Sequence, residues 1–109
     1  MGWLGDLERL TASLRSRPPG WWAHGEREAA ARTLVERLAD LGREAGDPVP
    51  AGAAPMAVAP YALADQLLVL GQDLVGADPG GMVAAGAAAA FAAASSVLQA
   101  PLRGARAHG

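Results

Sequence analysis

The side chains best suited to chemistry in this chain are two histidines and a few carboxylates, and their spacing matches no metal site. His24 and Glu28 stand four residues apart at the start of an expected helix, so both could face one ion. Two ligands do not make a metal site, and the paired Glu-x-x-His motif of di-metal bundles is missing. His108 lies in an expected tail. The sequence therefore predicts no metal and no cofactor, with His24 as a solvated residue.

Catalytic arrangements are equally unsupported. The serines at 13, 16, 95 and 96 lack a Gly-x-Ser-x-Gly context, and the glycine-rich stretch 76–81 lacks the lysine of a phosphate-binding loop. Because the chain has no cysteine, thiolate nucleophiles and thiolate zinc sites are excluded. Four carboxylates are expected on solvated helix faces: Glu36, Asp40, Asp65 and Asp73. These features favour a non-enzymatic protein.

The tryptophans form the most unusual pattern. Pro18, Pro19 and Gly20 precede Trp21 and Trp22, so two adjacent indoles follow a rigid turn. They could wall a pocket for a planar or hydrophobic ligand, or they could join Trp3 in a plug over one end of the fold, which we favour. The candidate ligand or interaction surface comprises Trp3, Trp21, Trp22, His24 and Met56.

The composition indicates one soluble globular domain. The chain has 109 residues, of which 51% are hydrophobic and 18% charged, with a net charge of −2. Every cation is an arginine, and alanine, glycine and proline are abundant, which is typical of a GC-rich bacterial genome. A slightly acidic chain is a poor match for nucleic acid. The first residues carry no basic region of a secretory signal, so a cytoplasmic location is expected.

Hydrophobic periodicity predicts an all-α fold with helices at about 3–17, 24–45, 60–76 and 79–100. The apolar stripes of the first three are Trp3, Leu7, Leu10 and Leu14; Ala31, Leu34, Leu38, Leu41 and Ala45; and Leu63, Leu67, Leu70 and Leu74. Short links within the first and last pairs predict two helical hairpins in a four-helix bundle. The domain spans 1–104, with a Pro/Ala-rich loop at 47–59 and a frayed tail at 105–109.

The fourth expected helix contains no charged residue. A helix that is apolar on all sides is buried, spans a membrane or is covered by a partner. Alanine contributes little to membrane insertion, so a membrane span is disfavoured. Two explanations stay open: the helix fills the narrow centre of the bundle, or one face forms a symmetric dimer seam. The candidate seam residues are Ala85, Ala88, Ala89, Ala92 and Ala93.

These features lead to a ranked set of functions. The leading hypothesis is a non-enzymatic module that works by protein–protein contact, as a homodimer or as an accessory subunit. The alternative is a binding protein for a small hydrophobic or aromatic ligand held between helices near the tryptophans. An enzyme with an unrecognised site comes third.

Overall fold

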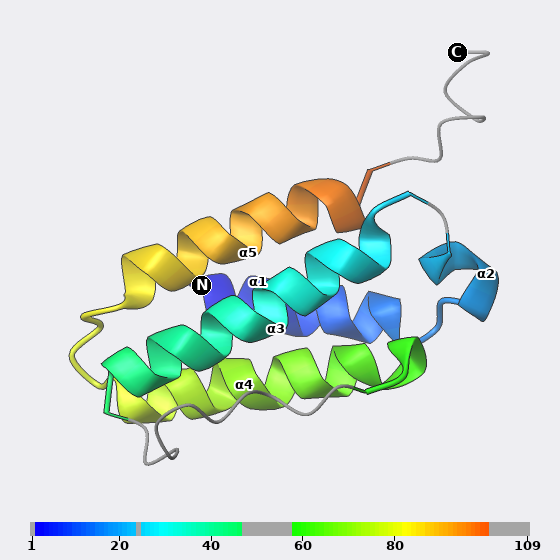
Figure 1. Ribbon diagram of the computed structural model, residues 1–109. Coiled ribbons are helices and arrows are strands. Elements are labelled where there is room, and N and C mark those ends of the chain that lie inside the picture. The colour runs from blue at the N-terminus through cyan, green and yellow to red at the C-terminus, as the bar shows by residue number, and fades with distance from the viewer. Residues whose placement is uncertain (1, 24, 47–57, 101–109) are drawn as a thin grey trace.

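Four long helices make up most of the structure (Figure 1). The computed structural model describes residues 2–23, 25–46 and 58–100, and every regular element within them is helical. In chain order the elements are α1 Trp3–Leu14, α2 Pro19–Trp22, α3 Arg27–Glu44, the 3-10 turn η1 Pro60–Ala62, α4 Leu63–Ala77 and α5 Ala84–Leu98. The all-helical class predicted from the periodicity is confirmed.

Leucines at helical spacing form the core. Each stripe repeats with the 3.6-residue period of a helix, so its members lie on one side and meet the stripes of neighbouring helices. The buried members are Leu7, Leu10 and Leu14 of α1, Ala31, Leu34, Leu38 and Leu41 of α3, and Leu63, Leu67 and Leu74 of α4. Trp3, Ala45 and Leu70, which the stripes also included, pack half-buried at its margin.

The two predicted hairpins are wrong in this respect, because α1 does not pack along α3 and α4 does not pack along α5. α3 packs along both α4 and α5, whereas α1 packs along α4 and only sparsely against α5. α1 and α3 therefore lie on one diagonal and α4 and α5 on the other; in Figure 1 α1 lies behind α3. The links at 15–26 and 78–83 permit this, because even six residues of chain reach about 20 Å.

The link between α1 and α3 contains an additional short helix. α1 ends at Leu14 rather than near residue 17, and the N–H of Arg17 closes a turn on the carbonyl of Leu14 at 3.1 Å. Pro19, which the sequence places in a rigid turn, is the first residue of α2. Proline suits a first helical position because its φ is already helical and that N–H needs no partner. Gly25, with φ of 61°, then separates α2 from α3.

α5 begins at Ala84, five residues later than predicted. The Asp78 carboxylate accepts hydrogen bonds from the backbone N–H groups of Met82 (2.8 Å) and Val83 (3.0 Å). Asp78 thus caps a turn as expected of an aspartate before a helix. Gly81 within this turn has a φ of 70°, which is incompatible with a continuous helix and delays its start.

The predicted loop at 47–59 and the predicted tail at 105–109 lie largely or wholly outside the described residues. Residues 47–57, including Met56, and residues 101–109 lie outside the described residues. Directly before η1, Arg32 of α3 donates a hydrogen bond to the carbonyl of Val58 at 2.8 Å, and Val58 packs against the core. Among the described helices, none combines the length and the apolar character needed to cross a bilayer.

Candidate functional site

The charged side chains form surface ion pairs rather than a reactive cluster. Arg15 Nε donates to a carboxylate oxygen of Asp65 at 2.8 Å, and Arg32 pairs with Glu28 at the same distance. The carboxylates at 36, 40, 65 and 73 are exposed, as expected. Within the described residues, no three His, Cys, Asp or Glu side chains lie close enough together to hold a metal ion. His24 lies outside those residues, so its expected solvated position stays a prediction.

The three tryptophans do not form one cluster. Trp21 and Trp22 contact each other edge to face, with ring centroids 4.9 Å apart, and Trp22 is buried in the core. Trp3 lies at the opposite end of α1, beside Gly71 of α4. A helix of 12 residues is about 18 Å long, so α1 holds Trp3 far from the Trp21–Trp22 pair. The predicted three-tryptophan plug is therefore wrong, and so is a ligand wall containing all three.

Arg27 is a buried cation that the sequence analysis missed. Its side chain is 6% exposed and donates hydrogen bonds to the carbonyls of Trp21 (3.1 Å) and Ala100 (3.3 Å). Its guanidinium also stacks over the Trp21 ring at 4.4 Å from the centroid, and Arg17 approaches the same ring at 5.1 Å. Arg27 thus links α2, the start of α3 and the end of α5. Its six-residue spacing from Trp21 was too weak a signal to find it.

Replacing Arg27 with alanine is expected to lower the free energy of unfolding by about 1–3 kcal/mol. The carbonyls of Trp21 and Ala100 lose a charged hydrogen-bond donor, and the Trp21 ring loses its cation–π contact. Urea denaturation followed by circular dichroism measures this change. Arg9→Ala is the control, since Arg9 is exposed on α1. Equal stability of the two variants would show that Arg27 does not hold the ends of these helices together.

α5 has one buried side and one open side. Its buried residues are Ala87, Ala94 and Leu98. All five alanines of the predicted seam are exposed: Ala85, Ala88, Ala89, Ala92 and Ala93. The helix therefore does not fill the centre of the fold, which was one of the two explanations for its lack of charge. Its open side presents methyl groups to solvent from Ala85 to Ala93.

A groove of about 560 Å³ lies between α3 and α5. Its floor includes Leu34 and Ala94, which are both buried. Among the described residues that line it, only Glu26 and Arg37 are charged. We use the name α3–α5 surface for this groove and the seam along α5: Ala29, Ala30 and Thr33 of α3 with Ala85, Ala88, Ala89, Ala92 and Ala93 of α5. Of the seam alanines, Ala89 and Ala93 line the groove, whereas Ala88 and Ala92 face the other side of α5, towards α1.

Comparison with known proteins does not assign a function to this surface. No protein family, curated protein or solved structure matches the chain.

The α3–α5 surface is wider than the predicted seam, because it includes exposed Ala29 and Thr33. Periodicity alone could not assign these two to the surface, since it does not show which helix lies beside α3.

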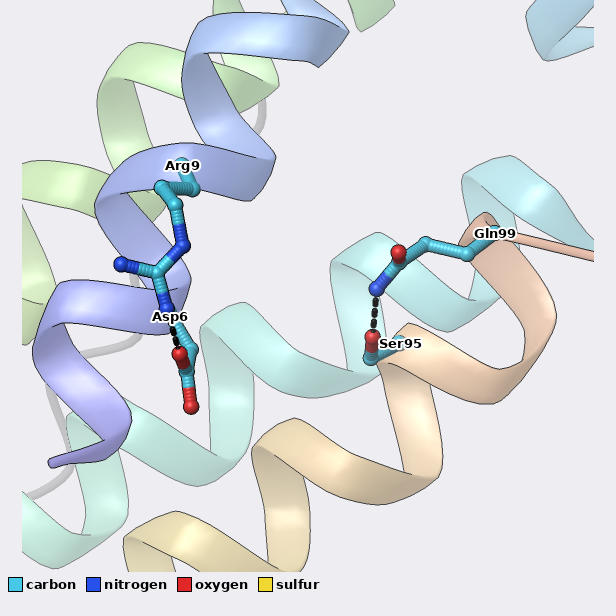
Figure 2. A network of polar contacts seen from close by, with 4 residues as sticks. All are labelled: Asp6, Arg9, Ser95 and Gln99. Atoms are coloured by element: carbon cyan, nitrogen blue, oxygen red, sulfur yellow. Dashed lines mark hydrogen bonds and ion pairs between the residues drawn. The ribbon is translucent and has the colours of Figure 1, made fainter. Parts of the chain in front are cut away.

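A second groove, of about 750 Å³, lies between α1 and α5, where these helices pack sparsely. Phe91 lines it, together with polar side chains from both helices. Figure 2 shows that Arg9 donates to Asp6 on α1 and that Gln99 donates to Ser95 on α5. Each pair is formed within its own helix, so these polar groups already have partners. The α3–α5 surface is the less polar of the two.

Proposed function

We propose that this chain is a non-catalytic interaction module, a bundle of its four long helices that self-associates through the α3–α5 surface. The observation that carries the proposal is the exposure of all five seam alanines on a helix without a charged residue. Water-exposed helix faces are usually charged or polar, whereas a smooth apolar face is typical of a contact site.

Alanine suits contact between two helices. Its small side chain lets two backbones approach closely, so that packing extends along the whole helix. α5 has 15 residues and is about 22 Å long. One face of a helix of this length buries much less area than the roughly 800 Å² that each partner contributes to a standard interface. The adjoining edge of α3 enlarges the contact, and we expect a dimer that dissociates on dilution.

A small hydrophobic ligand is the second candidate occupant, now placed in the α3–α5 groove rather than at the tryptophans. The groove volume of about 560 Å³ lies within the range of roughly 300–1,000 Å³ typical of ligand pockets. Its lining is mostly apolar. Native mass spectrometry separates the two candidates, since a monomer that carries a discrete adduct would favour the ligand.

Ala89→Glu is expected to abolish self-association, because it places a charge in the middle of the apolar contact. Sedimentation equilibrium measures the outcome: the wild-type mass should rise from 11.0 kDa towards twice that value with concentration, while the variant stays monomeric. Ala12→Glu is the matched control, since Ala12 is exposed on α1 and does not line the α3–α5 groove. A wild-type chain that is monomeric at every concentration would contradict the proposal.

A further inference from the structure

Within the described part of the chain, the two charged residues that line the α3–α5 groove lie at its opposite ends. α3 and α5 run in opposite directions, since Arg27 at the start of α3 bonds the carbonyl of Ala100 just beyond the end of α5. At the other end, Arg37 Nη2 lies 3.8 Å from the position that a Cβ on Gly86 would occupy. The groove therefore has a negative end at Glu26, beside the end of α5, and a positive end at Arg37, beside its start.

The spacing of residues along α3 suits a two-fold contact. Ala30 lies four residues after Glu26, and Thr33 lies four residues before Arg37. On α5, Gly86 lies at the Arg37 end of the groove and Val97 at the Glu26 end. A two-fold rotation about an axis across the middle of the groove would thus set each charged end against the opposite one.

We infer that a second copy of this chain docks antiparallel on the groove, so that Glu26 of each copy faces Arg37 of the partner subunit. The inference rests on the proposed self-association and names its geometry. In a two-fold interface, residue i meets j while j meets i, so one arrangement forms two identical ion pairs. A parallel arrangement would instead place Glu26 against Glu26 and Arg37 against Arg37, which like-charge repulsion disfavours.

Arg37 is only loosely paired within one chain. Among the described residues its ion-pair partner is Glu44, at 3.8 Å, and about half of each side chain is exposed. Arg37 can therefore turn towards a partner at little cost.

Charge reversal tests this geometry. Glu26→Arg and Arg37→Glu are each expected to weaken the dimer by about tenfold, because each creates two like-charge contacts per dimer. The double variant Glu26→Arg/Arg37→Glu restores both pairs and should dimerise within about threefold of wild type. Glu8→Arg is the control, since it makes the same charge change on an exposed position of α1 away from this groove.

Thiol crosslinking provides a second readout, which reports the orientation of the two copies. The chain has no cysteine, so introduced thiols are the only ones that react. A mixture of Glu26→Cys and Arg37→Cys chains should yield a covalent dimer with a short bifunctional thiol reagent, and each variant alone should yield much less. Efficient crosslinking between two Glu26→Cys chains would overturn the antiparallel geometry. So would charge-reversal variants whose dimers dissociate at the same concentration as the wild-type dimer. A monomeric wild type would instead refute self-association itself.

Discussion

Replacing Gly71 with leucine is expected to lower the free energy of unfolding by about 3 kcal/mol. Gly71 is buried in α4 at its closest approach to α1. A Cβ there would lie 2.5 Å from Leu7 Cδ2 and 3.2 Å from Leu4 Cδ1. Leu7 is fully buried, so it has little room to move aside, and a larger side chain would push α1 away from α4.

Urea denaturation measures this loss, and Gly76→Leu provides the control. Gly76 lies in the same helix, but no atom lies within 4 Å of a Cβ placed there. Removing a helical glycine normally adds up to about 1 kcal/mol to helix stability, so the control should be as stable as wild type or more so. Similar stability of Gly71→Leu and Gly76→Leu would mean that α1 can move off α4 without cost.

Leu67→Ala is expected to lower the free energy of unfolding by about 2–5 kcal/mol, because it removes buried methyl groups and leaves a cavity. Leu67 is 0% exposed and belongs to the stripe by which α4 enters the core. A domain of this size is stable by only about 5–15 kcal/mol, so the loss is a large share of the total.

Val69→Ala is the control for Leu67→Ala, since Val69 lies two residues away on the same helix and is 54% exposed. Its replacement should change the free energy of unfolding by no more than about 0.5 kcal/mol. Thermal and urea unfolding, both followed by circular dichroism, give the comparison. A difference below 1 kcal/mol between the variants would mean that this part of the core is loosely packed.

Stability and self-association should respond to different residues. Leu67 and Gly71 lie in the interior and support the helix packing, whereas Ala89 is exposed and contributes little to it. Ala89→Glu should therefore leave the unfolding midpoint of the diluted chain unchanged while it removes the dimer. If Ala89→Glu is a folded monomer, its loss of dimer results from the changed contact surface and not from unfolding.

Local features of the sequence determined the helical class and most of the core. The spacing of Leu7, Leu10 and Leu14, and of the leucines in α4, predicts which side of each helix is buried, because helical periodicity is a property of nearby residues. The start of α5 could not be predicted in this way, since the conformation of Gly81 decides where that helix begins.

Tertiary structure alone decided which helices are neighbours and where the tryptophans lie. The lengths of the links allow either adjacent or diagonal packing, so no short-range pattern distinguishes the hairpins from the observed arrangement. Trp3 and Trp21 could share a cluster only if the chain doubled back along α1. It instead continues through α2 to α3, and the two indoles stay at opposite ends.

The open side of α5 also depends in part on the local sequence and in part on tertiary packing. The sequence by itself determined that this helix has no charge, and so that its surface is smooth on every side. It could not determine which side faces solvent, because alanine at most positions gives the helix no strongly preferred apolar face. Packing against α3 selected Ala87, Ala94 and Leu98 for burial and left Ala85, Ala88, Ala89, Ala92 and Ala93 exposed.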